Sequence, residues 1–323
     1  MRTPPRPRSL FPPLLLLLVI AASRPAPAAD FAAAFLEVGI GERAIGLGQA
    51  FTAVADDASA GYWNPAGLVY VDGRVLLSHQ PLSLDRQHLS ISFALSIRDE
   101  LGVGLTMIHA GVDDITARDA TGMTLGDIDD ANNAYLVSVG RAIGQRLAVG
   151  VSMKVIRQQI KAPVGSRSTL GEGKANGFDL GMRYRLGEHT VLAAVVRNLK
   201  TELNWKVDRG NQRTSSTKDA MPTTLAVGAS HRPLPQLLVT ADLVRNTLDT
   251  VVNAGAEWQV SPVLILRSGL HAVDGADILR AGSFTAGLSL RPMRQDALQF
   301  HYAFATDPVG NGGRTALGSE VIF

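Results

Sequence analysis

From about residue 74 to the C-terminus, apolar side chains recur at every second position in runs of about ten residues. This period of two is typical of β-strands whose two faces differ chemically. The clearest run places Leu89, Ile91, Phe93, Leu95 and Ile97 on one face and His88, Ser90, Ser92, Ala94 and Ser96 on the other. The pattern therefore predicts an all-β chain built from two-faced strands.

The runs add up to fourteen candidate strands. An even number allows both ends of a single-chain bacterial barrel to lie on one side of the membrane. The last run ends in Phe323, and a terminal aromatic residue resembles the signal by which outer-membrane barrels are recognised for insertion. The expected strands cover 74–80, 86–97, 101–111, 132–142, 146–160, 174–186, 189–199, 221–232, 236–246, 250–259, 262–271, 280–291, 296–306 and 315–323.

The connections between these strands alternate between short and long. Outer-membrane barrels have short turns on the periplasmic side and longer loops outside. From a periplasmic N-terminus, the expected short turns are 99–100, 143–145, 187–188, 233–235, 261 and 292–295, and the long loops are 112–131, 161–173, 200–220, 272–279 and 307–314. Only 247–249 departs from this order. A soluble sandwich has no reason to sort its loops in this way, so the sequence predicts a 14-stranded antiparallel transmembrane β-barrel.

The first 29 residues have the three parts of a secretory signal peptide: a basic head, an apolar run over 14–22 and a small-x-small end at 26–28. The apolar run is too short for a membrane-spanning helix, which needs about 20 residues. We therefore expect cleavage after Ala28 or Ala29 and residence in the bacterial outer membrane, in contact with its lipid.

Charge and composition exclude several classes of function. Removing residues 1–29 takes away four arginines and no acid, which leaves 27 basic and 29 acidic residues. Such a balance offers no basic face for nucleic acid. The chain has no cysteine, which excludes disulfides and thiolate metal sites, and its seven histidines show no metal-ligand spacing. We predict no cofactor, no metal and no catalytic residue, and hence a protein that is not an enzyme.

The stretch from Val38 to Leu68 is too rich in glycine for one uninterrupted helix or strand. Asp56 or Asp57 can cap a short helix through residues 58–60, which the Asn64-Pro65 pair then ends. A barrel of eight strands fills its interior with side chains and one of sixteen leaves a channel, so fourteen strands need a plug. We predict that residues 30–73 fold into the lumen; the alternative is a cap or a segment packed outside.

Three blocks of this stretch, 46–51, 55–58 and 63–68, occur in a fixed order. Together they resemble the N-terminal signature of the PorV/PorQ family, a branch of the FadL-like (OMPP1/FadL/TodX) outer-membrane barrels. The resemblance implies a fourteen-stranded barrel with a hatch in its lumen, divided into a signal peptide (1–29), a hatch (30–73) and a barrel (74–323). The hatch or gating residues that it implies are Gly46, Gly48, Phe51, Asp56, Asp57, Trp63, Asn64 and Pro65.

Four charged residues of the plug, Glu42, Arg43, Asp56 and Asp57, would be costly to bury without partners of opposite sign. The expected wall partners are Lys154, Arg183, Arg185 and Arg267 for the acids, and Asp179, Asp242 and Glu257 for Arg43. We predict that some of these pairs hold the hatch shut. The alternative is helix capping by the aspartates and solvated charges elsewhere in the lumen.

Two functions remain open. Resemblance to the FadL-like group implies passive transport of a hydrophobic small-molecule ligand across the outer membrane, past a hatch that shifts. Resemblance to the PorV/PorQ branch implies an accessory barrel whose outer loops bind partner proteins of a secretion system or serve surface attachment. A soluble periplasmic β-protein is the third alternative.

Overall fold

The computed structural model describes residues 32–83, 85–98, 100–164, 167–208, 215–247, 249–273, 282–292, 297–306 and 313–323. The expected signal peptide lies outside these residues. The strands are β1 (Arg74–Pro81), β2 (Arg86–Ile97), β3 (Leu101–Arg118), β4 (Thr124–Ile143), β5 (Leu147–Val164), β6 (Arg167–Arg185), β7 (Thr190–Leu199), β8 (Glu202–Asp208), β9 (Ser215–Ala220), β10 (Thr224–Leu234), β11 (Leu237–Arg245), β12 (Thr250–Ser261), β13 (Leu264–Val273), β14 (Gly282–Leu290), β15 (Leu298–Thr306) and β16 (Gly313–Ile322).

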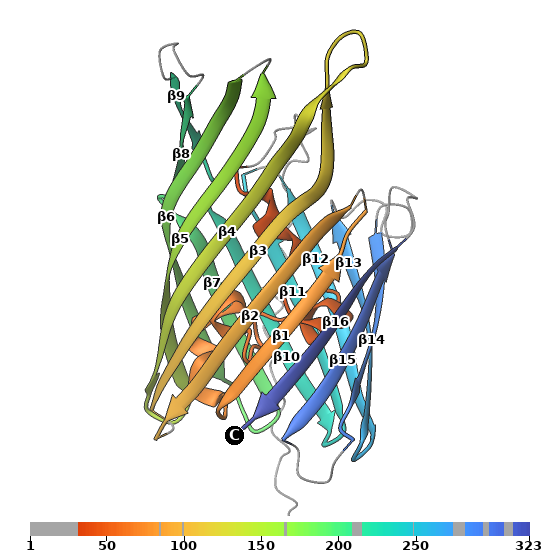
Figure 1. The fold of residues 1–323 in the computed structure, drawn as a ribbon. Helices are drawn as coiled ribbons and strands as arrows, with labels where there is room; N and C mark the ends of the chain where they lie inside the picture. Colours follow the sequence, from red (N-terminus) through yellow and green to blue (C-terminus); the bar gives the residue numbers. More distant parts are fainter. Residues whose placement is uncertain are drawn as a thin grey trace, which may run out of the picture.

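Fourteen of these strands, β1 to β7 and β10 to β16, form a closed antiparallel barrel (Figure 1). The first strand pairs with the last, since Ser78 lies opposite Gly318. The ring is complete on the other side because β5 pairs with β6 and β6 with β7. Strands β8 and β9 stand outside this count and form a hairpin added to the far end of β6. The predicted fourteen-stranded antiparallel barrel is therefore confirmed.

The alternation seen in the sequence separates the two faces of the wall. On β2, Leu89 and Ile91 are 39% and 50% exposed, whereas their neighbours Ser90 and Ser92 are buried. Large apolar side chains recur on the outer face of most strands, and small polar ones face the lumen. An apolar outer band around a polar interior is the arrangement of transmembrane β-barrels.

Three expected long loops are instead largely extended strand. β3 and β4 remain paired from Leu101 and Arg141 as far as Arg118 and Thr124, β5 and β6 pair up to Val164 and Arg167, and the 200–220 connection contains β8 and β9. These extensions carry polar residues on both faces, so the apolar alternation stops although the backbone ladder continues. The resulting sheet rises above the rest of the rim (Figure 1).

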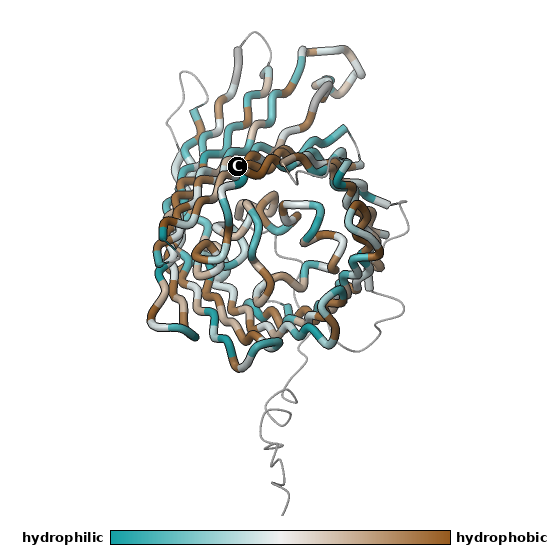
Figure 2. The backbone as a smooth tube through the Cα atoms, turned by 90° about the horizontal axis from the view of Figure 1, so that it is seen from below, coloured by the Kyte–Doolittle hydropathy of each residue, from teal (hydrophilic) through white to brown (hydrophobic). Residues whose placement is uncertain are grey.

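The N-terminal segment, which we define as residues 32–73, lies inside the ring of strands (Figure 2). It contains four short elements: η2 (Ala34–Val38) and η3 (Pro65–Tyr70), both 3₁₀-helices, and the helices α1 (Glu42–Gly46) and α2 (Ala60–Trp63). None of the helices in the described part of the chain is long and apolar enough to cross a membrane. Helices this short are not stable in isolation, so their folded conformation depends on contacts with one another and with the wall.

Candidate functional site

An aromatic cluster forms the centre of the N-terminal segment. Phe51 and Tyr62 pack edge-on against Trp63, with ring centroids 6.0 and 5.0 Å away. The indole of Trp63 donates to the carbonyl oxygen of Ile40 at 3.0 Å, and the Tyr62 hydroxyl donates to that of Leu36. These bonds join the two halves of the segment, and the same apolar cluster includes wall residues such as Ile108.

The Asn64-Pro65 pair anchors the segment to the wall. The Asn64 side chain donates to the carbonyl oxygens of Thr52 at 2.9 Å and Met182 at 3.2 Å, and accepts from the backbone N–H of Ala66. Pro65 occupies the first position of η3, where its missing N–H costs nothing. The helix preceding it, α2, begins at Ala60, and Asp57 accepts from Ser59 in the turn before that helix instead of capping residues 58–60.

A row of four glycines lines the wall where this pair lies. Gly102, Gly140, Gly150 and Gly181 face one another on the adjacent strands β3 to β6. A methyl group added at Gly150 would lie 2.6 Å from the Pro65 carbonyl oxygen, and one at Gly181 2.9 Å from the Pro65 ring. The backbone of the segment therefore touches the backbone of the wall directly.

A second glycine contact lies on the opposite wall. Gly48 has a φ of 64°, and a side chain there would meet the backbone of Leu270. Gly255 and Gly269 leave room for the backbone of Leu47 and Gly48. These wall glycines are not among the site residues predicted from the sequence, although glycine within a strand is itself a signal that another backbone approaches closely.

Substitution at Gly150 should loosen the segment. Gly150→Val would overlap the Pro65 main chain, and overpacking of this kind costs about 1–3 kcal/mol. Hydrogen exchange at residues 64–70 should become faster in this variant. Gly187→Val is the matched control, because no atom lies within 4 Å of the position where its side chain would begin. Equal exchange in both variants would contradict the close contact.

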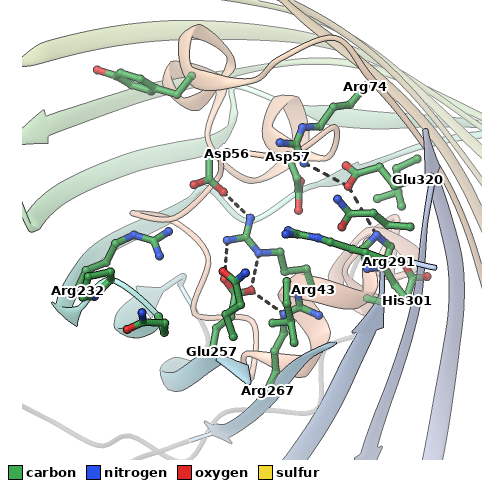
Figure 3. A pocket seen from close by; sticks show the side chains of 18 residues that line it. Arg43, Asp56, Asp57, Arg74, Arg232, Glu257, Arg267, Arg291, His301 and Glu320 are labelled. Atoms are coloured by element: carbon green, nitrogen blue, oxygen red, sulfur yellow. Dashed lines mark hydrogen bonds and ion pairs between the residues drawn. The ribbon is translucent and has the colours of Figure 1, made fainter. Parts of the chain in front are cut away.

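Arg43 is the centre of a buried charge network on the turn side of the segment (Figure 3). Its guanidinium pairs with Asp56 of the segment and with Glu257 of β12, where Nε and Oε2 are 2.7 Å apart. Arg267 of β13 binds the same Glu257 oxygen at 2.7 Å and donates to Ser289 on β14. Arg43 is thus bound directly to β12 and is linked through Glu257 and Arg267 to β13 and β14.

This network determines the protonation states of Arg43 and Asp56. Burial alone would lower the pKa of Arg43, but the carboxylates of Asp56 and Glu257 hold it well above its usual value. Burial would raise the pKa of Asp56, but the positive charge of Arg43, and of Arg183 beyond it, lowers it. Both groups are therefore ionised, as a closed ion pair requires.

The other predicted partners are distributed differently. Lys154 and Asp179 pair with each other on the wall at 2.9 Å and bind Asn198, without reaching a charge of the segment. Asp242 accepts from the backbone N–H of Thr52 at 2.8 Å, and Arg183 donates to the Ala53 carbonyl oxygen at 3.3 Å. These contacts run to the backbone of the segment, which the sequence offers no means of foreseeing.

Glu42 lies at the seam between the first and last strands. It accepts from the Ser78 hydroxyl, its second oxygen has no hydrogen-bond partner, and Gly318 leaves the space that its carboxyl group occupies. Burial, with smaller contributions from Asp57 and Glu320, raises its pKa to about 7. Glu42 is therefore largely protonated below neutral pH.

The stability with which the N-terminal segment packs against the wall should depend on pH through the titration of Glu42. Because the pKa of Glu42 is raised on folding, its contribution is fully present below about pH 4.5 and is lost as the pH rises through about 7. In the wild-type protein, packing of the N-terminal segment against the wall should therefore become less stable as the pH rises from about 4.5 through about 7. Hydrogen exchange at residues 42–46 measures this change. Glu42→Gln should flatten this part of the profile. A profile of unchanged slope in the variant would assign the effect to other groups.

The two sides of the N-terminal segment differ in chemistry. Towards the long-loop end, Phe35 and Leu36 belong to the same apolar cluster as Leu203, Trp205 and Met221. Towards the short turns, the segment faces a polar cavity of about 240 Å³, whose lining includes Arg43, Asp56, Asp57, Glu257 and Glu320 (Figure 3). A buried apolar cluster thus lies on the loop side of the segment, and a charged cavity lies on its turn side.

These features define a closed barrel of the outer-membrane type with its own N-terminal segment packed in the lumen. No protein-family model matches the sequence, and comparison with curated proteins finds no similar one. Solved structures do share the fold. The toluene transporter TodX of P. putida matches with a TM-score of 0.63 at 12% identity, over 88% of this chain and 99% of that one.

Two further structures agree. The toluene transporter TbuX of Ralstonia pickettii matches with a TM-score of 0.61 at 14% identity, over 88% of this chain and 98% of that one. A FadL homologue of Pseudomonas aeruginosa matches with a TM-score of 0.59 at 12% identity, over 87% and 98%. At these identities the likeness establishes a FadL-like fold, and the PorV/PorQ branch is not distinguished by it.

Proposed function

We propose that this protein is an outer-membrane channel for passive uptake of hydrophobic small molecules, with the N-terminal segment acting as its hatch. The observation that carries the proposal is the difference between the two sides of the segment inside the lumen: an apolar cluster lies on the side of the long loops, and a charge network fastens the opposite side. The toluene transporters with the same fold support this function by analogy.

The hatch must shift to let a ligand pass, because backbone and wall are in direct contact at both glycine patches. Motion of α1 can be blocked by an engineered disulfide. Because the chain has no cysteine of its own, two introduced cysteines can pair only with each other within the chain. A Cβ atom built at Gly46 lies 3.2 Å from the Cα atom of Gly287, so the two Cα atoms are well within the separation of about 7 Å beyond which a disulfide cannot form. The double variant Gly46→Cys/Gly287→Cys is therefore a reversible lock.

Uptake of radiolabelled toluene by a Gram-negative host expressing the protein tests both parts of the proposal. Wild-type protein should increase uptake over an empty vector, the oxidised double variant should abolish the increase, and reduction should restore it. Each single cysteine variant serves as the control. Full uptake through an oxidised, fully cross-linked barrel would contradict a shifting hatch, and no increase by the wild type would contradict transport of such ligands.

A partner-binding role is the second candidate, favoured by the sheet that rises above the rim. Its last strand, β9, pairs only with β8 among the described residues, and all six of its side chains are exposed. A free strand edge is a template for pairing with another chain. Purification from outer membranes in mild detergent should then recover a stoichiometric protein partner, which deletion of residues 202–220 should remove.

A further inference from the structure

The sheet that rises above the rim carries basic side chains on its outer face. Arg157 of β5, Lys174 of β6 and Lys206 of β8 are all exposed. Arg157 lies directly opposite Lys174, and β8 pairs with the same stretch of β6 (Figure 1). Neighbouring strands are about 4.8 Å apart, so these three cations lie within one small area of the surface. We define them as the basic patch.

A single carboxylate lies among the three cations. Glu172 is opposite Lys206 in the β6–β8 pair, and its Oε2 is 2.9 Å from Nζ of Lys174. Lys206 and Arg157 also act on its charge. Within the described ranges, neither Arg157 nor Lys206 forms an ion pair of its own. Three positive charges thus share one negative charge, which leaves the basic patch with an excess of positive charge.

The neighbours of the basic patch across the strands are neutral amides. Asn133 on β4 lies opposite Arg157, and Asn204 on β8 lies opposite Lys174. Gln159 on β5 lies opposite Glu172. These residues add no further acid to the patch, and their side-chain amide groups are potential hydrogen-bond donors.

The basic patch lies at the edge of the apolar outer band. On β5 the outer face reads Val149, Val151, Met153 and Val155 before Arg157 follows. Two residues span about 7 Å along a strand. Head groups occupy about 5–8 Å beyond the hydrocarbon core on each side of a bilayer. The first cation of the patch therefore lies at the level of lipid head groups, directly above a surface that contacts acyl chains.

The charges of the basic patch suit a phosphate group. Lysine and arginine are tolerated at this level, because their stems lie along apolar surface while their charged ends reach the head groups. A guanidinium binds phosphate oxygens through paired, charge-assisted hydrogen bonds, and an ammonium binds them as a point charge. A phosphate monoester carries a charge of about −1.5 to −2 at neutral pH. Its charge therefore complements the positive excess of the patch.

We propose that the basic patch binds a phosphate monoester on the head group of an outer-leaflet lipid, whose acyl chains lie against the apolar band below. The long-loop end of such a barrel faces outwards, which places the patch in the outer leaflet. The site lies on the outside of the wall, away from the lumen. The inference is therefore independent of the proposed transport and applies equally to a partner-binding barrel.

Native mass spectrometry of the full chain in detergent tests the inference with two probes: diphosphoryl lipid A and the same glycolipid stripped of its phosphates. Arg157→Gln/Lys174→Gln/Lys206→Gln should bind diphosphoryl lipid A at least about tenfold more weakly, since each basic residue near a lipid surface contributes to binding of anionic lipid. Its affinity for the stripped lipid should change by less than about twofold. Unchanged affinity for diphosphoryl lipid A in the folded variant overturns the inference.

The matched control removes three arginines that are exposed at the short-turn end, Arg98, Arg141 and Arg146. Their replacement by glutamine changes the net charge equally and should alter the affinity for diphosphoryl lipid A by less than about twofold. Equal weakening in the two triple variants would show attraction by net charge alone and would overturn the site.

Glu172→Gln gives a change of opposite sign. It removes the carboxylate that competes with the lipid phosphate for Lys174, so diphosphoryl lipid A should bind about threefold more tightly. Weaker binding by this variant would contradict the proposed arrangement of charges. An equal concentration of inorganic phosphate should not displace the lipid, because it has no acyl chains. Displacement would identify free phosphate as the occupant and overturn the lipid assignment.

Discussion

A chain lacking residues 32–68 should form an open barrel and increase the permeability of liposomes to small polar solutes by at least about tenfold, since fourteen strands enclose a lumen wider than side chains alone can fill. The barrel wall should stay closed without the N-terminal segment, because every strand of the ring pairs with two neighbouring strands. The deletion therefore removes the obstruction and leaves the ladder. Liposome swelling in arabinose measures the effect.

Deletion of the turn 119–123 is the control, because this turn is exposed at the far rim and contributes nothing to the lumen. Circular dichroism must first show that both shortened chains retain their β-structure. An unchanged swelling rate for the folded hatch deletion would mean that other parts of the chain close the lumen. The hatch proposal would then be wrong.

Arg43→Ala should release the N-terminal segment from the wall at β12 to β14. Removing one partner of a buried ion pair leaves the other charge uncompensated and costs about 3–5 kcal/mol. Here Glu257 retains Arg267, whereas Asp56 loses the side chain that binds it. Native-state hydrogen exchange at residues 42–57 reports the free energy of local opening and should show this loss.

A double-mutant cycle with Glu257→Gln separates the pair from its surroundings. The combined effect of the two substitutions should be smaller than the sum of the single effects, because either change already breaks the same bond. Arg86→Ala, at an exposed residue whose side chain is hydrogen-bonded to Ser83, should leave exchange in the segment unchanged. Additive effects in the cycle would show that Arg43 and Glu257 act independently.

Strand number and the two faces of the wall were predictable because both depend on local features. The alternation of apolar and polar side chains on β2 and the short turns at one end of the barrel can each be recognised from a few consecutive residues. β2 has the predicted bounds. The extensions of β3 to β6 were not predictable in this way, because their polar residues resemble loops. Pairing between strands, as between Ala117 and Gly126, maintains them beyond the apolar pattern.

The charged residues show the same division. Arg43 and Glu257 were among the predicted partners and do meet, yet Lys154 and Asp179 were predicted with equal reason and pair with each other. The sign of a charge and its position on the lumen-facing side of a strand select a set of candidate ion-pair partners. Which members of the set meet depends on the rotation of the segment and on the stagger of the strands.

The sequence by itself determined the antiparallel barrel, its strand number and the glycine-rich stretch that cannot form a regular element, since each follows from residue periodicity or backbone preference. Tertiary structure alone decided where that stretch touches the wall. Four glycines from four strands become neighbours only when the strands are staggered into a closed ring, and only then does a flat strip of backbone exist for Pro65 and its neighbours to lie against. Contacts between residues far apart in the chain are set by this closure, which no local pattern encodes.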